Sequence, residues 1–266
     1  KQLSYWYLAQ SYRKAGKPDK ALPTLQLAVQ LYPENLELLL SLAELYHETA
    51  LYSQAKNLYE RVLESDPEDS EQLPRLHAGL ARTYEALGYL SRAAENYKKA
   101  MELDESHVNA LLKDYSACLL KQRKYAEAGT AVTKALAAAP QDSELLFLSA
   151  KINYATGQKE AATARLTTAL EKDPGRDDIR LTLALWLISA GNYRQAEAQA
   201  EQVYSRHPDS AQAQWALGLT MINSSGKKER ALALLRKAAS SISSPFTAEI
   251  AQLLLDKAGK KQTHQQ

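Results

Sequence analysis

A repeat of 34 residues constrains this chain more than any other feature of its sequence. Prolines occur at Pro33, Pro67, Pro140, Pro174 and Pro208, so successive prolines are 34 residues apart except across one gap of 73. That gap equals two periods plus five residues, and it holds one unit without a helix-ending proline and a short insertion around residues 70–73. A fixed period of this length indicates stacked copies of one supersecondary unit.

Small residues follow the same period at three positions in each unit. The first series is Ala9, Ala43, Ala81, Ser116, Ala150, Ala184 and Gly218; the second is Ala21, Ala55, Ala93, Ala128, Ala162, Ala196 and Ala231; the third is Ala28, Val62, Ala100, Ala135, Ala169, Val203 and Ala238. Small side chains let two helices approach closely, so each series is expected to lie inside a helix–helix contact.

Apolar residues within each unit recur at helical spacing. One helix carries Leu39, Leu42, Ala43 and Tyr46, spaced i, i+3, i+4 and i+7, and the next carries Ala55, Tyr59 and Val62. Glycines mark the turn between the two helices at Gly16, Gly88, Gly157, Gly191 and Gly226. Each unit is therefore predicted to be a helical hairpin. Since no hairpin can bury its apolar face alone, seven of them are expected to stack on a continuous core.

Several recurring residues resemble a known family. Leu42-Ala43, Tyr46, Ala55, Tyr59, Val62 and Pro67 are similar to the tetratricopeptide repeat. The resemblance implies an all-α solenoid, a right-handed superhelix of antiparallel helical hairpins. The seven predicted repeats are 2–35, 36–69, 74–108, 109–142, 143–176, 177–210 and 211–244. The pattern departs from the family at Glu105, which replaces the helix-ending proline, and at Leu119, Asn153 and Leu187, where the family usually has tyrosine.

The two ends of the chain differ. Pro245 and Glu249 suit the first turn of a helix, a run of leucines at 253–255 supplies apolar bulk, and Gly259 ends it. Residues 245–259 are therefore predicted to form a capping helix, and residues 260–266 a polar, disordered tail. The chain starts at Lys1 directly in the first helix without such a cap, which favours a piece of a longer protein, either cut inside it or matured by removal of a leader.

The composition excludes several classes of function. The 33 basic and 31 acidic side chains leave a formal net charge of +2, which argues against a dedicated nucleic-acid binder. The nearest approach to a membrane span, residues 181–190, is too short to cross a bilayer. Cys118 is the only cysteine and cannot form an intrachain disulfide. The compartment stays open between the cytoplasm and, if a leader was removed, the periplasm or cell envelope.

Catalytic motifs are incomplete in this sequence. Gly226-Lys227-Lys228 lacks the upstream glycine spacing and the Ser/Thr of a phosphate-binding loop. The histidines are scattered; His77 is predicted to be a structural residue that faces inward, and Cys118 a small buried hydrophobe. We therefore predict no enzymatic activity and no catalytic residues, and neither a cofactor nor a metal.

The repeat spacing leaves some residues of each first helix facing the concave side of the superhelix. In the N-terminal half these residues are polar and of mixed charge: Trp6, Arg13, Glu44, Glu48, Arg82 and Lys113. The favoured interpretation is a solvated series of salt bridges between repeats, each contributing ~0–1 kcal/mol. The alternative is a polar groove for a charged peptide. A carboxylate clamp of the kind found in some relatives is not expected, because Ala117 occupies the place of its asparagine.

In the C-terminal half the same side is apolar. Leu181, Leu185 and Ile188 share one helix face, and the next unit repeats their spacing. The predicted partner-binding strip consists of Phe147, Tyr154, Leu181, Leu185, Ile188, Trp215, Leu219 and Ile222. Large exposed apolar patches usually mark interaction sites. The cap helix, the tail or a second copy of the chain could instead cover the strip, so self-association is a competing outcome.

The sequence thus predicts a non-catalytic scaffold that holds a partner protein, as a helix or an extended peptide, in its concave groove. A rigid array presents spaced side chains, so little entropy is lost on binding. Two alternatives stay open. One is a module of a larger assembly, such as a bacterial cell-envelope export or secretion complex. The other is the repeat arm of an enzyme whose catalytic domain lies outside this chain.

Overall fold

The chain is all-α, as the sequence predicted. The structure, a computed structural model, describes residues 2–65, 71–222 and 227–241, and over these ranges it contains fourteen α-helices, one 3-10 turn and no strand. The predicted capping helix at 245–259 and tail at 260–266 lie outside the described residues.

The helices have nearly uniform lengths of three to four turns. Their bounds are α1 Gln2–Lys14, α2 Pro18–Leu31, α3 Leu36–Glu48, α4 Tyr52–Glu64, α5 Leu73–Ala86, α6 Leu90–Leu103, α7 Val108–Lys121, α8 Tyr125–Ala138, α9 Ser143–Ala155, α10 Lys159–Lys172, α11 Asp177–Ser189, α12 Tyr193–Arg206, α13 Ala211–Met221 and α14 Lys228–Ser241. The 3-10 turn, Glu105–His107, directly precedes α7.

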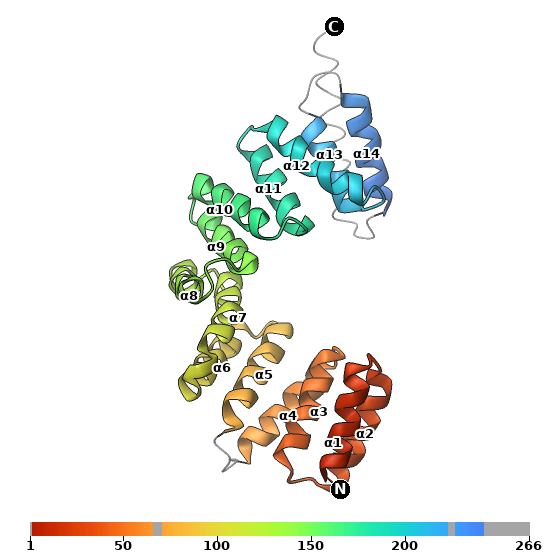
Figure 1. Ribbon diagram of the computed structural model, residues 1–266, viewed down its shortest axis with the longest axis vertical. Helices are drawn as coiled ribbons and strands as arrows, with labels where there is room; N and C mark the ends of the chain where they lie inside the picture. The colour runs from red at the N-terminus through yellow and green to blue at the C-terminus, as the bar shows by residue number, and fades with distance from the viewer. Residues whose placement is uncertain (1, 66–70, 223–226, 242–266) are drawn as a thin grey trace. The chain divides into compact units, whose positions relative to one another are not determined.

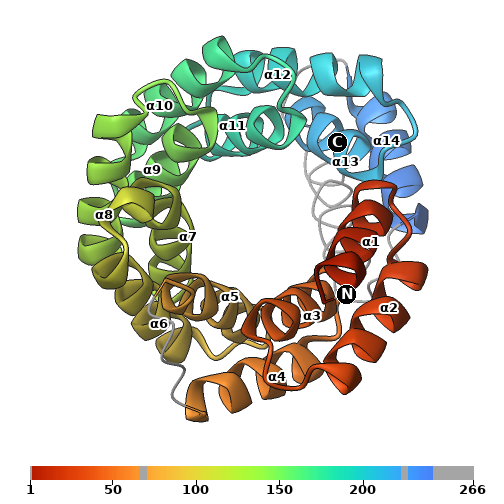
Figure 2. The same ribbon diagram turned by 60° about the horizontal axis from the view of Figure 1, so that its bottom comes forward.

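Consecutive helices pack as hairpins, α1 with α2, α3 with α4 and so on to α13 with α14 (Figure 1). The hairpins form two compact units, Lys1–Ala139 with α1 to α8 and Pro140–Gln266 with α9 to α14. Within each unit the odd-numbered helices lie on one face and the even-numbered helices on the other (Figure 2). We call the first of these the odd-helix face of the unit.

The three series of small residues lie in the helix–helix contacts, as predicted. Every member of the three series is buried. Gly218 shows why the positions must be small: a Cβ atom there would lie 2.7 Å from Cγ of Leu235 and 3.1 Å from the backbone oxygen of Ala231. The small residues that recur every 34 positions therefore mark the places where neighbouring α-helices approach most closely.

The turns inside the hairpins use one backbone conformation. Gly16, Gly88, Gly157 and Gly191 have positive φ, as expected from their place after a helix. In the second and fourth hairpins the same place is held by Ala50, at φ 59°, and Arg123, at φ 60°. The left-handed turn is therefore set by the hairpin packing, because it forms even where a side chain makes it costly. Gly226 lies outside the described residues.

The turns between hairpins are closed by caps that follow the prolines. Asn35 accepts a hydrogen bond from the Leu38 amide at 3.0 Å, and Asp142 accepts from the Leu145 amide at 3.0 Å. Ser210 accepts from the Ala213 amide at 3.4 Å. Each cap comes two residues after a proline, so the proline ends one hairpin and the cap begins the next.

In the second unit, two buried polar side chains donate hydrogen bonds to the backbone of these turns. Arg180 donates from Nη2 to the carbonyl of Pro174 at 3.0 Å, and Gln214 donates from Nε2 to the carbonyl of Pro208 at 2.7 Å. Arg180 and Gln214 are 34 residues apart, as are the two prolines. The same buried polar contact thus ties both α11 and α13 to the turn that precedes them.

His77 and Cys118 have the structural roles predicted for them. His77 is buried, with Nδ1 2.8 Å from Oδ1 of Asn96. The amide nitrogen of Asn96 donates to the Arg92 carbonyl, so its oxygen faces the imidazole and accepts from Nδ1–H. Cys118 is fully buried, its Sγ donates to the Leu90 carbonyl at 3.4 Å, and burial raises the pKa of the thiol.

Candidate functional site

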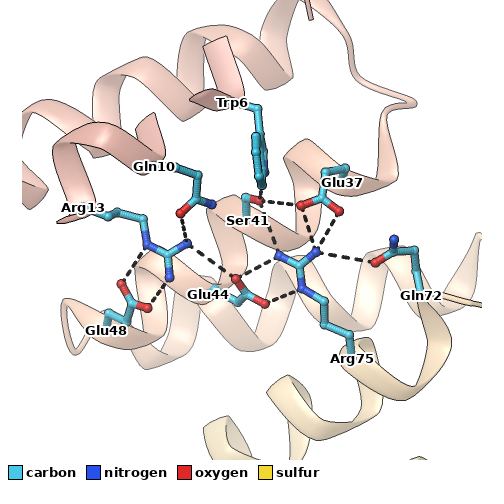
Figure 3. A network of polar contacts seen from close by, with 9 residues as sticks. All are labelled: Trp6, Gln10, Arg13, Glu37, Ser41, Glu44, Glu48, Gln72 and Arg75. Carbon is cyan, nitrogen blue, oxygen red and sulfur yellow. Dashed lines mark hydrogen bonds and ion pairs between the residues drawn. The ribbon is translucent and has the colours of Figure 1, made fainter. Parts of the chain in front are cut away.

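Arg75 is the centre of a polar network on the odd-helix face of the first unit (Figure 3). From α5 it donates through Nη1 to Oε2 of Glu37 at 2.7 Å, and through Nε and Nη2 to the two oxygens of Glu44 at 2.6 and 3.0 Å. Burial opposes the charge of Arg75, but the hydrogen bonds to Glu44 and Glu37 outweigh it and raise the pKa of the guanidinium. Arg75 therefore remains charged and holds α5 against α3.

Arg13 makes the corresponding link between α1 and α3. Its Nε donates to Oε2 of Glu48 at 3.1 Å, its Nη2 also pairs with Glu48, and its Nη1 lies 3.6 Å from Oε2 of Glu44. Trp6 adds a third link, because its indole Nε1 donates to Oγ of Ser41 at 3.0 Å (Figure 3). Glu44 is thus shared by two arginines from the hairpins on either side of it.

The same arrangement continues from α5 to α7. Arg82 pairs with Asp114 at 3.1 Å, and Lys121 pairs with Glu85 at 2.8 Å. The charged residues of the first unit therefore form a series of ion pairs between neighbouring hairpins, which is the arrangement favoured from the sequence. Lys113 lies half-buried on α7.

A pocket of about 640 Å³ opens beside this network. Its walls come from α1, α3, α5 and α7, with Tyr59 contributed by α4 and with Glu71, Gln72 and Asp104 contributed by the turns that precede α5 and α7. Arg13, Glu44, Glu48 and Arg82, which the sequence analysis placed in a groove, all line it. The predicted groove residues Trp6 and Lys113 are not among the residues that line it.

Two further lining residues, Tyr59 and Gly79, were not predicted to have a functional role. The Tyr59 side chain is only 1% exposed, and burial raises the pKa of its phenol. A Cβ atom on Gly79 would lie 2.3 Å from the Tyr59 hydroxyl, so the absence of a side chain there makes room for it. Gly79 itself was the signal in the sequence that could have predicted this contact. Glycine is unfavourable inside a helix, so its presence there indicates that another group packs closely against it.

His47 stands at the edge of the pocket between α3 and α5. Its Nδ1 lies 3.1 Å from Oγ1 of Thr83, and that hydroxyl donates to the Gly79 carbonyl at 2.8 Å. Thr83 must therefore accept, which assigns the proton of the neutral imidazole to Nδ1. Burial, and then the nearby Arg82, lower the pKa of His47. The neutral imidazole is thus the favoured form.

The second unit holds the predicted apolar strip. On α11, Leu185 is the most exposed of its members, at 42%, while Leu181 packs against the core cluster formed with Ala184 and Leu217. On α13, Trp215 and Leu219 are half-buried, and Ile222, just after the helix, packs against the same cluster. α11 and α13 are in direct contact, so these side chains share one odd-helix face.

The α9 part of the strip is less open than the sequence implied. Phe147 is only 5% exposed, and the Lys151 ammonium lies 3.7 Å from its ring centroid. Tyr154 stacks on Trp186 of α11, with ring centroids 4.2 Å apart and an angle of 10° between the rings. Trp186 was not predicted for the strip.

A family model described as tetratricopeptide repeat matches residues 12–80, 119–185 and 153–217. A second model with the same description matches residues 74–107, so the matches cover well over half of the chain. The chain belongs to the tetratricopeptide repeat family. The family predicted from Leu42-Ala43, Tyr46 and the residues that follow them is therefore confirmed. Proteins of this family are generally protein-interaction scaffolds and typically non-catalytic.

Two curated relatives are distant and longer. Tetratricopeptide repeat protein 8 of Caenorhabditis elegans is 22% identical over 193 residues, which are 72% of this chain and 37% of the relative. The BBSome complex member BBS4 of Bos taurus is 27% identical over 202 residues, 75% of this chain and 38% of the relative. The chain thus spans less than two-fifths of the length of either relative.

Solved structures share the tetratricopeptide fold. A tetratricopeptide repeat protein from Parabacteroides merdae has a TM-score of 0.74 at 17% identity, over 96% of this chain and 98% of that one. The APC/C hetero-tetramer Cut9–Hcn1 gives 0.71 at 15% identity, over 92% of this chain and 47% of that one. YrrB, described as a tetratricopeptide repeat protein with an unusual peptide-binding site, has a TM-score of 0.52 at 24% identity, over 73% of this chain and 97% of that one. At these identities the likeness shows the fold alone.

The odd-helix faces carry different side chains in the two units. Within the ranges that the structure describes, no three His, Cys, Asp or Glu side chains are grouped so that they could hold a metal ion. In the same ranges no helix has the length and apolarity needed to cross a membrane. What the faces offer is arginine and carboxylate pairs in the first unit and apolar side chains in the second.

Proposed function

We propose that this chain is a non-catalytic scaffold that holds a segment of a partner protein on its odd-helix faces. The observation that carries the proposal is the pocket of the first unit, which is lined by side chains from four successive odd helices. Its charged walls are fixed by ion pairs between hairpins, so they need not be ordered when a ligand arrives. Preorganisation of this kind lowers the entropic cost of binding.

The second unit supplies the apolar part of this proposed surface. The strip contributes Leu185, Trp215 and Leu219, which keep part of their surface on the odd-helix face. Burying one such side chain in a partner contributes ~1.5–3 kcal/mol, and tryptophan is a frequent hot spot of protein interfaces. One relative is a member of the BBSome complex, which supports a role of this chain in a protein assembly.

The proposal is tested by replacing Leu185 with glutamate and capturing partners from cells that express this chain. The charge lies on an exposed position, so we expect normal folding by circular dichroism and at least a tenfold loss of partner recovery. Leu27→Glu is the matched control, because Leu27 is 46% exposed but lies on the even helix α2. It should leave recovery unchanged.

Two outcomes would count against the proposed surface. Equal recovery by wild type and Leu185→Glu would remove the strip from the interface. If Leu185→Glu instead converts a dimer to a monomer in sedimentation, with no partner lost, then a second copy of the chain is what covers the strip.

A further inference from the structure

α1 carries an exposed apolar surface that is separate from the pocket of the first unit. Tyr7 and Leu8 are exposed, Leu8 by 45%, and the exposed Ser4 and Ser11 lie one turn away on either side of them. The spacing i, i+3, i+4 and i+7 puts all four residues on one side of the helix. We call these four residues the α1 end face. None of them lines the pocket.

The later odd helices use the same positions to contact the hairpin that precedes them. Counted from the first series of small residues, Ser41 of α3 holds the place of Tyr7, and it accepts from the Trp6 indole of the preceding hairpin at 3.0 Å (Figure 3). The place of Leu8 is buried in all six later odd helices, where it holds Leu42, Leu80, Tyr115, Ser149, Leu183 and Leu217. This side of an odd helix is therefore a contact surface, and in α1 it is exposed.

The α1 end face does not match a hairpin stacked as the hairpins of this chain stack on one another. The place of Ser4 holds a buried apolar residue in every later odd helix, such as Leu38 in α3. The place of Tyr7 holds Gly79 in α5, where Tyr59 of the preceding hairpin leaves no room for a Cβ atom. A hairpin stacked in that position would leave a gap at Ser4 and crowd Tyr7, and closely packed interfaces tolerate neither.

The same face is complementary to a second copy of itself. The sizes of Ser4, Tyr7, Leu8 and Ser11 follow the order small, large, large, small, which is the same in both directions along the helix. When two α1 helices pack antiparallel about a two-fold axis between residues 7 and 8, each tyrosine contacts the partner's Leu8 and each Ser4 lies opposite the partner's Ser11. A two-fold interface requires reciprocal contacts of this kind.

The polar groups near this face are compatible with an antiparallel contact. Ser11 Oγ donates to the Tyr7 carbonyl of its own helix at 2.8 Å, so burying it leaves no hydroxyl proton without an acceptor. α1 has no acidic side chain, and Lys14 in its last turn is exposed. Antiparallel packing puts the two Lys14 side chains at opposite ends of the helix pair, whereas parallel packing would bring these like charges together.

We propose that two copies of the chain associate through their α1 end faces, with the two α1 helices antiparallel. The proposal is independent of the proposed function. Trp6 and Arg13 bond to α3 from another side of α1, so the contact does not use the side chains of the polar network. Each copy in the dimer keeps its own pocket for a partner segment.

Sedimentation of the full chain between about 1 and 100 μM tests this association, and we expect a concentration-dependent dimer. Leu8→Glu should raise the dissociation constant of the dimer about a hundredfold, because each dimer carries the change twice. Leu27→Glu is the matched control: Leu27 is 46% exposed and belongs to the same hairpin, but it lies on α2. It should dimerise as wild type does. Circular dichroism should show that both variants are folded, since both positions are exposed.

Cysteine cross-linking tests the antiparallel arrangement. Under mild oxidation, a mixture of the Ser4→Cys and Ser11→Cys proteins should form a disulfide-linked dimer, and neither protein alone should do so. Two copies of residue 4 would lie about 10 Å apart along the helix pair, which is too far for a disulfide. The native Cys118 is fully buried and does not compete.

Each result decides the proposal. A wild type that stays monomeric over this range overturns it, as does equal dimerisation of wild type and Leu8→Glu. If Leu185→Glu removes the dimer and Leu8→Glu does not, the apolar strip is the surface of self-association and the α1 end face is not. Cross-linking of Ser4→Cys with itself would contradict the antiparallel arrangement. Partner recovery by Leu8→Glu should equal that of wild type, so this proposal and the proposed function fail separately.

Discussion

Replacing Gly218 with valine should destabilise the second unit by about 3 kcal/mol, since it overfills a closed helix–helix contact. The new Cβ atom would meet Leu235 on α14 at 2.7 Å and the Ala231 backbone oxygen at 3.1 Å. The leucine can change its side-chain conformation, but the backbone oxygen belongs to a helix and can move only with α14. The measurement is urea unfolding, followed with amide exchange on α13 and α14.

Gly175→Val is the matched control for this prediction. Gly175 lies in the exposed turn between α10 and α11, where a Cβ atom would be an ordinary 3.4 Å from Asp173. The change should alter the free energy of unfolding by no more than ~0.5 kcal/mol. If Gly218→Val were as mild as Gly175→Val, the close approach of α13 and α14 would be wrong.

The second large effect is expected at Leu183, two residues before the exposed Leu185 on the same helix. Leu183 is only 4% exposed, so glutamate there would bury an unpaired charge and lose the packing of the leucine. We expect Leu183→Glu to cost about 4 kcal/mol or more and to unfold α11 and the hairpins next to it. Leu185→Glu should cost almost nothing in stability.

Circular dichroism and thermal melting of the two variants decide this point. The expected result is a folded Leu185→Glu protein and a largely unfolded, or much less stable, Leu183→Glu protein. Equal losses in both would mean that Leu185 also belongs to the core, and the apolar strip would then have no exposed centre.

The fold could be predicted from the sequence because the repeated residues mark the turns and the helix–helix contacts. Pro33, Pro140 and Pro208 locate the turns between hairpins, and the alanine series locate the contacts inside them. The prolines recur in five of the seven units and the small residues in all seven, so single exceptions do not obscure these signals. Ala50 and Arg123 illustrate this: neither is a glycine, yet each adopts the left-handed turn that the period assigns to it.

The candidate site was only partly predictable. The spacing identified Arg13, Glu44 and Arg82 as residues of one face, but which arginine pairs with which carboxylate depends on how neighbouring hairpins stack. Tyr59 was expected in the core because tyrosines recur at packing positions of the repeat. That its hydroxyl reaches the pocket depends on the missing side chain of Gly79, which lies twenty residues further along.

Phe147 and Trp186 show the same limit in the second unit. Helical spacing placed Phe147 on the open face, but the Lys151 side chain folds over its ring. Trp186 was not predicted for this surface, but the ring of Tyr154 from the preceding hairpin stacks on it. The end of a long side chain can lie on another helix face than its Cα atom. Helical periodicity predicts only the face on which the Cα atom lies.

The most direct test of the account is methyl NMR of the chain, labelled at its alanine methyl groups, with a bound partner segment. The account predicts shifts at methyls of the odd helices, such as Ala78, Ala110 and Ala155, and none at Ala126, Ala161 and Ala164 on the even helices α8 and α10. Shifts confined to the even helices would contradict the claim that the odd-helix faces bind the partner.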